Sequence, residues 1–300
     1  MRLFENPSFD FIRGQKIAYV VSGLLLAISL VTIIGKGLQY GIDFTGGLQF
    51  VVEFEQPVQV TEIRTALTEP LGITPDVKRY GSPSDIMIRA DVDRSTNEVQ
   101  DIFLSTFESE FPDNKAKIIK TDVVGPRFAE DLKRGAFKAI IFALIVIFLY
   151  ILIRFKNWRF STGAVAALFH DVIITLGLFT LLNEVMPFNM QIDQAIIAAF
   201  LTIVGYSIND TVVVFDRIRE NSINFKTMEF NKMINRSLND TLSRTVITSV
   251  TTLFVVTVLF IFGGEVLRGF SFVLLVGIFL GTYSSLYVAS AVVVELEKTR

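Results

Sequence analysis

The sequence predicts a polytopic α-helical membrane protein with six transmembrane helices and one α+β, ferredoxin-like extracytoplasmic domain. Hydrophobic residues make up 51% of the 300 residues and charged residues 19%, whereas soluble domains carry about 25% charged residues. The apolar residues are concentrated in six long runs, and residues 35–135, between the first and second runs, are of mixed composition. These observations indicate a membrane bundle with one folded domain outside it.

Each of the six runs is long enough to cross a bilayer, which takes about 20 mostly apolar residues. We predict spans at residues 17–34, 136–153, 163–182, 192–215, 246–262 and 270–294. The first run follows basic residues, as a cleaved signal peptide would. It exceeds the usual h-region of about 7–15 residues and no A-x-A site follows it, which favours a retained anchor.

Short loops rich in Lys and Arg predict the cytoplasmic side of a membrane protein. Loop 154–159, the segment 216–236 and the C-terminal end are basic, whereas 183–191 has no basic residue and 263–269 has only Arg268. We therefore expect both the N- and the C-terminus in the cytoplasm. Residues 35–135 are long enough to translocate largely regardless of their charge.

The outside segment has the periodicity of a small α+β domain. We predict strands at 48–55, 76–80, 85–90 and 117–124 and amphipathic helices at 61–69 and 97–111. This order of elements is that of a ferredoxin-like sheet with both helices on one face. Gly125-Pro126 then predicts the start of the next helix. The chain is thus expected to divide into the cytoplasmic N-terminus and first span (1–35), an extracytoplasmic domain (36–134), and a five-helix bundle with cytoplasmic loops and the C-terminus (135–300).

Several classes of function lack the residues that they need. The chain has no cysteine and a single histidine, so we expect no disulfide, no metal centre and no cofactor. It has no P-loop, so its energy must come from a gradient or a partner. The sequence has no basic patch with interleaved aromatic residues, which nucleic-acid binding would need. It also has no recognisable set of catalytic residues that would indicate an enzyme. The outside domain reads as an interaction module, and an open sheet edge would be able to add an extended peptide.

Polar residues within the predicted spans are the candidate functional residues, because a charge in hydrocarbon costs at least about 2.5–3.5 kcal/mol. Asp210 lies in the fourth span beside Asn209 and at helical spacing from Ser207. It is either a carboxylate that binds and releases a proton or a helix–helix hydrogen-bonding group. Ser207 and Asn209 oxygens would suit a proton or a sodium ion equally well.

Two further sites leave similar alternatives open. Arg244 begins the fifth span and shares a stripe with Thr248, so it is either a counter-ion or a snorkelling interfacial residue. His170 and Asp171 lie midway along the third span, where histidine can titrate near neutral pH. They form either a proton relay or a structural pair. Together with Ser207 and Thr248 they would line a polar path.

Five sequence stretches carry a resemblance to a known family. They are GIDFTGG (41–47), VGP (124–126), HDVIITLG (170–177), VGYSINDTVVVFDRIREN (204–221) and LSRTVITSVTTL (242–253). With them the chain resembles the SecF family of protein-export membrane subunits, within the resistance-nodulation-division superfamily. The stretches cover nearly the whole chain.

The resemblance implies a location in the cytoplasmic (inner) membrane, contact with membrane lipid, and a complex with SecD and the SecYEG translocon. It implies that the proton-motive force pulls unfolded preproteins outward late in translocation. The family's intramembrane aspartate and arginine fall on Asp210 and Arg244. We expect protonation of Asp210 to weaken its pairing with Arg244 and to move the outside domain. A half-transporter for small-molecule efflux and a non-transporting assembly scaffold are the alternatives.

Overall fold

The computed structural model describes residues 7–92, 94–186 and 188–298. Six helical segments in this part of the chain are long and apolar enough to cross a membrane. They are α1 (Phe11–Lys36), α5 (Pro126–Phe155), α6 (Trp158–Leu182), α7 (Gln194–Asn224), α8 (Phe230–Phe262) and the run of α9 (Glu265–Ser284), η1 (Ser285–Ala289) and α10 (Ser290–Lys298). The six predicted spans are therefore confirmed.

The fourth and fifth spans extend farther than their apolar runs. Helix α7 ends at Asn224 and α8 begins at Phe230, so 216–236, predicted as a basic loop, is mostly helical. These turns have an inner face, on which Ile218, Ile234 and Leu238 are buried together. The prediction stopped at the charged residues, but helices continue wherever one apolar face finds a partner.

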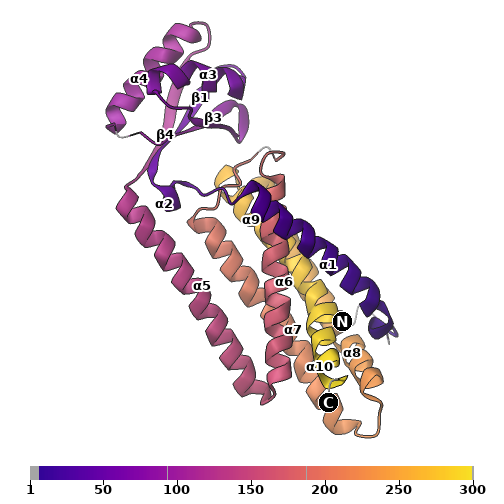
Figure 1. The fold of residues 1–300 in the computed structure, drawn as a ribbon. Helices are drawn as coiled ribbons and strands as arrows, with labels where there is room; N and C mark the ends of the chain where they lie inside the picture. The colour runs from indigo at the N-terminus through magenta and orange to yellow at the C-terminus, as the bar shows by residue number, and fades with distance from the viewer. Residues whose placement is uncertain (1–6, 93, 187, 299–300) are drawn as a thin grey trace.

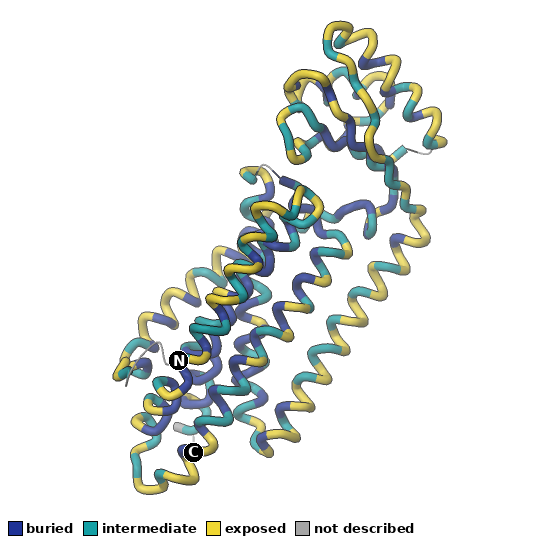
Figure 2. Tube along the Cα trace, turned by 180° about the vertical axis from the view of Figure 1, so that it is seen from behind, coloured by how far each residue is buried: buried dark blue, intermediate teal, exposed yellow. Residues whose placement is uncertain are grey.

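Helix α5 stands apart from the other spans, as Figures 1 and 2 show from opposite sides. Its buried residues are Ala129 near its start and Ile151 and Phe155 near its end. The residues between them are mostly exposed in this chain alone, including Phe137, Phe142 and Ile145. In contrast, α6, α7 and α9 form the buried centre of the bundle.

A small α+β unit lies between α1 and α5, at the end of the bundle opposite the two chain ends (Figure 1). It contains α2 (Ile42–Thr45), β1 (Gly47–Phe54), α3 (Val60–Leu71), β2 (Asp76–Tyr80), β3 (Ser82–Ala90), α4 (Thr96–Glu110) and β4 (Ala116–Val124). The sheet is antiparallel with the order β2-β3-β1-β4. The predicted ferredoxin-like order of elements is present, and the unpredicted α2 precedes it.

One face of the sheet is covered by both helices of the unit. Phe50 and Phe54 of β1 meet Phe103 and Phe107 of α4 edge to face, with ring centroids 4.9 and 5.2 Å apart. Such pairs favour this packing beyond the area they bury. The turn between β2 and β3 is tighter than the predicted one at 81–84, because Gly81 adopts a φ of 79° and β3 begins at Ser82.

The other face of the sheet contacts the segment after α1 and the end of the bundle through polar groups. Arg89 donates to the carbonyl oxygen of Tyr40 at 2.8 Å. Lys78 donates to the side chain of Gln39 at 3.0 Å, and Gln191 donates to Asp76 at 2.8 Å. Contacts of this kind are exchangeable with water at small net cost, so the unit is docked by an interface that can open.

The two connections to the unit touch at Gly46. This residue has a φ of 77°, and a Cβ atom there would lie 3.2 Å from the Cα of Pro126, the first residue of α5. Glycine is therefore required both by the backbone conformation and by the close approach. We call residues 37–47 and 124–126 the neck of the unit.

Candidate functional site

Asp171 lies at the centre of a buried polar cluster within the bundle. Its side chain is fully buried in α6. Its Oδ2 atom accepts hydrogen bonds from Ser207 of α7 and from Ser284 of α9, each at 2.7 Å. Its Oδ1 atom lies 2.9 Å from Nδ1 of His170. A buried carboxylate needs such donors, and here they fasten α6, α7 and α9 together.

His170 continues this cluster to the first span. Its Nε2 atom lies 3.0 Å from Oγ of Ser22 in α1. Ser22 lies 2.9 Å from the hydroxyl of Tyr283, which in turn donates to the carbonyl oxygen of Ala18 at 3.1 Å. The buried polar cluster thus consists of Ser22, His170, Asp171, Ser207, Tyr283 and Ser284, contributed by four helices. We call it the histidine cluster.

Asp210 belongs to a second group one turn farther along α7. Its side chain is 4% exposed, and its Oδ2 atom accepts a hydrogen bond from Ser249 of α8 at 3.4 Å. Ser249 in turn accepts from Thr282 of α9 at 2.6 Å. The carboxylate therefore has a weak hydroxyl partner in the interior of the bundle, where a charge is costly.

The remaining predicted site residues form no described side-chain hydrogen bond or ion pair with Asp210. Arg244 is exposed on α8, and among the described ion pairs none within 4 Å joins it to Asp210. Asn209 is exposed on α7. Thr248 donates to the carbonyl oxygens of Arg244 and Thr245 in its own helix. The structure thus joins His170, Asp171 and Ser207 by hydrogen bonds, whereas no described side-chain hydrogen bond or ion pair joins Asp210 to Arg244, Asn209 or Thr248.

Three consecutive residues of α9 connect the two groups. Thr282 bonds to Ser249 of α8, Tyr283 to Ser22 of α1, and Ser284 to Asp171 of α6. The π-helical turn η1 begins at the next residue. Such turns are rare and occur often at functional sites. A change at any one of these contacts therefore alters the packing of one short segment of α9.

Small residues allow these helices to come close. A Cβ atom at Gly281 would lie 3.1 Å from Cβ of Ser207, and one at Gly277 would lie 2.1 Å from Ile203. Small-residue faces of this kind permit close helix packing in membranes. The Gly277-x-x-x-Gly281 spacing was the available signal for this crossing. The single hydroxyls of Ser22, Ser249, Thr282, Tyr283 and Ser284 were missed because hydroxyl residues are ordinary in transmembrane helices.

The neck also contacts the helix that carries Asp210. Asp193 is the N-cap of α7 and accepts from the backbone N–H of Ile196 at 2.9 Å. Asp43 of α2 accepts from the backbone N–H of Gln194 at 3.0 Å. Burial raises the pKa of Asp193 above its ordinary value, and the nearby Asp43 carboxylate also raises it. Two carboxylates from different segments therefore share one helix start.

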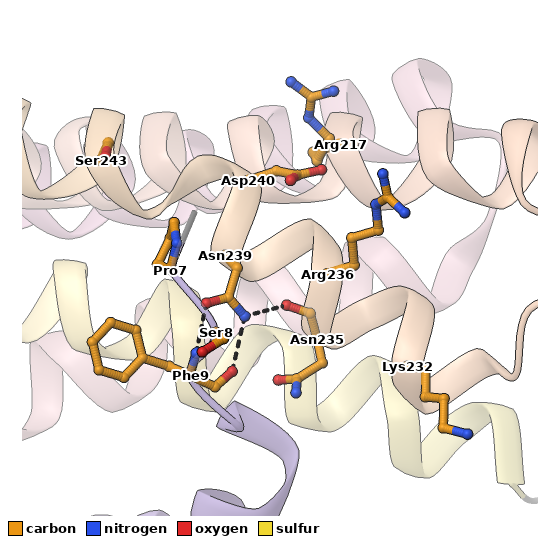
Figure 3. Close-up of a pocket in the computed structure, with 10 residues that line it drawn as sticks. All are labelled: Pro7, Ser8, Phe9, Arg217, Lys232, Asn235, Arg236, Asn239, Asp240 and Ser243. Carbon is orange, nitrogen blue, oxygen red and sulfur yellow. Dashed lines mark hydrogen bonds between the residues drawn. The ribbon is translucent and has the colours of Figure 1, made fainter. Parts of the chain in front are cut away.

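A polar pocket of about 600 Å³ lies at the other end of the bundle, between the N-terminal segment, α7 and α8. Figure 3 shows Asn239 holding Phe9 by two hydrogen bonds, while Arg217, Lys232 and Arg236 point in different directions. Arg217 and Lys232 pair with glutamates of their own helices or turns. The cations do not converge on one point, so the pocket is not a built anion site. Within the described residues, no group of three His, Asp or Glu side chains is placed to hold a metal ion.

Comparisons with known proteins agree on one family. Residues 105–299 match the model described as protein export membrane protein SecD/SecF, C-terminal, and residues 31–58 match the SecD/SecF GG motif. The protein translocase subunit SecF of Rhodothermus marinus is 59% identical over 99% of this chain and 96% of that protein. The Haemophilus influenzae subunit of the same name is 42% identical over 97% of this chain and 86% of that protein.

Solved structures show the same likeness. The crystal structure of SecDF from Thermus thermophilus, described as a translocon-associated membrane protein, matches with a TM-score of 0.86 and 37% identity. The match covers 98% of this chain and 39% of that one, so the chain spans well under half of SecDF. SecDF in a super-membrane-facing form matches with a TM-score of 0.71 and 36% identity.

Proposed function

This chain belongs to the SecD/SecF family of protein export membrane proteins, and from this premise we propose that it works as a SecF-type subunit of the Sec machinery. In this role it couples the proton-motive force to a late stage of preprotein translocation across the cytoplasmic membrane. The 59% identity to a protein translocase subunit SecF along nearly the full chain supports this more than any other observation. The relatives' names describe transport rather than an enzymatic reaction.

The proton-coupling group of this proposal is Asp210. Its side chain is buried inside the bundle and accepts a hydrogen bond from Ser249. Ionised, it accepts this hydrogen bond at 3.4 Å, a long distance, so the bond is worth less than the about 1.5–3 kcal/mol typical of a charged acceptor. One charge crossing about 100 mV supplies about 2.3 kcal/mol. The energy of one proton is thus large enough to change how α8 and α9 pack against Asp210.

Arg244 acts in this proposal at longer range. It is exposed on α8, not in contact with Asp210, so its attraction adds to that of Ser249 without replacing it. At 4 Å and an effective dielectric constant of 20 two charges attract by about 4 kcal/mol, which is an upper bound for this pair. Asn209 and Thr248 are the other polar residues of the proposed proton path. Asn209 is exposed on α7, and Thr248 donates to a carbonyl oxygen of its own helix, α8.

Movement reaches the sheet unit through the neck. Helix α7 carries Asp210 and begins at the hydrogen bond between Asp43 and Gln194. A shift of α7 therefore moves the neck, and the hydrogen bond from Gln191 of the bundle to Asp76 of the sheet is the contact that opens. The lower TM-score with the super-membrane-facing form, at nearly equal identity, supports an arrangement that changes.

The partners are SecD and the SecYEG translocon, with unfolded preprotein as the client. The exposed apolar surfaces of α5 and α8, including Phe142 and Phe254, support a partner helix bundle and lipid around this chain. We place both termini in the cytoplasm, residues 36–134 outside it and the five helices of 135–300 in the inner membrane. The acidic Asn183–Gln191 loop and the basic loops at the other end support this orientation.

Export in inverted membrane vesicles tests the proposal. A slowly translocating preprotein is followed with the gradient present or collapsed, with the SecD partner, in wild type and in Asp210→Asn. We expect the variant to assemble normally and to lose the gradient-dependent part of export. Thr202→Ala, two turns away on the same helix and exposed, is the matched control. If Asp210→Asn exports as wild type does, Asp210 only holds helices together and the scaffold alternative replaces the motor.

The efflux alternative has a weaker basis. Apart from the short helix α2, the region between α1 and α5 forms a single ferredoxin-like unit of four strands and two helices. The named relatives are translocase subunits. Gradient-dependent resistance to small molecules, lost in Asp210→Asn while export is unchanged, would restore this alternative.

A further inference from the structure

The hydroxyl end of the histidine cluster fixes the position of one proton on His170. The carbonyl oxygen of Ala18 can only accept, so the proton of the Tyr283 hydroxyl points to it. Either atom of the Ser22–Tyr283 pair can donate, but all three contacts of this chain are hydrogen bonds only when Ser22 donates to the Tyr283 oxygen. Only lone pairs of Ser22 are left to face Nε2 of His170 at 3.0 Å. In this arrangement Nε2 of His170 carries a proton.

The carboxylate end of the cluster fixes a second proton. Ser207 and Ser284 both donate to Oδ2 of Asp171. The remaining oxygen, Oδ1, faces Nδ1 of His170 at 2.9 Å. Two lone pairs would repel at this distance, so one proton lies between these two atoms, on either side. His170 and Asp171 together thus hold two protons.

The charge of the pair agrees with this count. With both protons the pair has no net charge, and with one it has a net charge of −1. A net charge in a fully buried site is costly. Every hydroxyl contact of Asp171 comes from a donor, and a nitrogen occupies its other side. This donor set favours a proton over a sodium ion, which needs oxygen atoms that accept it.

We propose that His170 and Asp171 form a second proton-binding site, separate from Asp210, and that the structure represents its proton-loaded state. Release follows the hydroxyl chain. The Nε2 proton passes to Ser22, the Ser22 proton passes to Tyr283, and the Tyr283 proton passes to a solvent water molecule at the hydroxyl of the partly exposed Tyr283. Each hydroxyl again holds one proton, and His170 keeps the one at Nδ1. That this proton belongs to the transport cycle rests on the proposed function, whereas its presence does not.

Release has a structural consequence. In the released state Tyr283 donates to Ser22 and no longer to Ala18, so one of the contacts between α9 and the backbone of α1 is lost. Thr282 and Ser284, on either side of Tyr283, hold Ser249 and Asp171. The proton content of the histidine cluster therefore affects Thr282, Tyr283 and Ser284 of α9. The first of these, Thr282, also bonds to Ser249, the hydrogen-bond donor of Asp210.

The titratable groups around His170 are few. Asp171 faces it from its own helix, and Tyr283 faces it from α9 with ring centroids 5.9 Å apart. Helix α1 presents Ser22, and α7 presents Ser207 to Asp171, with Asp210 one turn beyond. A change in the protonation of the His170 ring is thus assigned to the pair of His170 and Asp171.

The single histidine of the chain makes the site directly measurable. The full chain with ¹⁵N-labelled histidine is reconstituted in bilayers with unlabelled SecD partner, and the ring nitrogens are followed by NMR from about pH 5 to pH 9. We expect Nε2 to be protonated at low pH and to lose its proton at high pH, which leaves the less common Nδ1–H tautomer. Nε2 in one fixed state across this range would overturn the proposal.

A matched pair of variants tests the hydroxyl chain. Tyr283→Phe removes the acceptor of the Ser22 proton, so Ser22 is free to donate to Nε2. The loss of one hydrogen bond of about 0.5–1.5 kcal/mol is expected to move the Nε2 transition to lower pH by up to about one unit. Tyr287→Phe, whose ring stacks on Tyr283 at 5.3 Å, is the control and should leave the transition in place. Equal transitions in the two variants would contradict the hydroxyl chain.

The experiment separates this proposal from the proposed function. The NMR measurement requires no export, so a silent His170 would leave the role of Asp210 in export untouched. Conversely, loss of the coupling role of Asp210 in the vesicle assay would leave a titrating Nε2 atom as a proton site in its own right.

Discussion

The carboxylate of Asp43 accepts a hydrogen bond at 3.0 Å from the backbone N–H of Gln194, the first residue of α7. The neck of the sheet unit is therefore part of the cap of the helix that carries Asp210. Helix starts have unsatisfied N–H groups, and a side-chain acceptor there holds the first turn in place. A membrane helix and the sheet unit are joined here by a hydrogen bond in addition to the chain itself.

Replacing this acceptor should loosen the start of α7. In Asp43→Ala the lost cap is worth about 1 kcal/mol, so the first-turn amides of α7 should exchange hydrogen about fivefold faster. Asp43→Asn keeps an acceptor oxygen and should exchange nearly as wild type does. Hydrogen exchange read by mass spectrometry measures both. Equal protection in wild type and Asp43→Ala would mean that Asp193 caps the helix alone.

Removing the carboxylate of the histidine cluster should destabilise the bundle. Asp171→Ala leaves Ser207, Ser284 and His170 without their buried acceptor, and each unsatisfied group costs about 1–3 kcal/mol. We expect a loss of at least about 3 kcal/mol in the free energy of unfolding in detergent, by the same principle. Thr202→Ala, in the exposed part of α7, is the control. A loss under 1 kcal/mol would contradict the described hydrogen bonds.

The close approach at the neck can be separated from its backbone conformation. Gly46 and Gly72 both have positive φ angles, 77° and 73°, but only Gly46 has a neighbour near its missing Cβ. Gly72→Ala should cost about 1 kcal/mol for the left-handed conformation alone. Gly46→Ala should cost more, because Pro126 must move. Thermal unfolding of the two variants compares them, and equal losses would show that the crossing at Pro126 is loose.

The capping box of α4 predicts a pH dependence in the sheet unit. Glu98 accepts from the backbone N–H of Ser95 at 2.9 Å, which lowers the pKa of Glu98 below its ordinary value of 4.5, and the Ser95 hydroxyl adds to this. Since the pKa is lower in the folded state, ionised Glu98 stabilises the fold above the unfolded-state pKa. This stabilisation is lost as the pH falls through the folded-state pKa.

Hydrogen exchange near the start of α4 measures this dependence. After correction for intrinsic rates, the protection of the α4 first-turn amides should fall as the pH is lowered from about 6 to about 3, a range around the ordinary carboxyl pKa. In Glu98→Gln it should change less. The same fall in both proteins would assign the effect to another carboxylate.

The six spans and the order of the sheet were predictable because their signals are local. Apolar runs and alternating side chains are properties of neighbouring residues. The span predicted at 17–34 therefore matches α1, and the strand predicted at 48–55 matches β1. The boundary between α7 and α8 was wrong because its charged turns pack through Ile234 and Leu238 against a distant segment. Local polarity does not contain that information.

The candidate site was predictable only in part for the same reason. Asp210, His170 and Asp171 stood out because charge is rare in a membrane span. Their partners are hydroxyls such as Ser22 and Tyr283, 261 residues apart in the chain. The sequence also favoured a pair between Asp210 and Arg244, but spacing along two helices does not fix how each is rotated. Arg244 faces outward from α8 in this chain.

The absence of cysteine from the sequence allows the central claim to be tested in the native background. Asp76→Cys and Gln191→Cys place two thiols where a hydrogen bond of 2.8 Å now joins the sheet to the loop before α7, at the end of the bundle. The rate at which these thiols crosslink reports how often the unit is docked. Single-cysteine proteins are the control for crosslinks between molecules.

The decisive measurement is this crosslinking rate in vesicles containing the SecD partner, with the proton gradient on and off, in chains with Asp210 or with Asp210→Asn. We predict that the gradient slows crosslinking when Asp210 is present, because the unit spends less time docked. We predict the same rate with and without the gradient in Asp210→Asn. A gradient effect that persists in Asp210→Asn would contradict the claim that a proton on Asp210 moves the sheet unit.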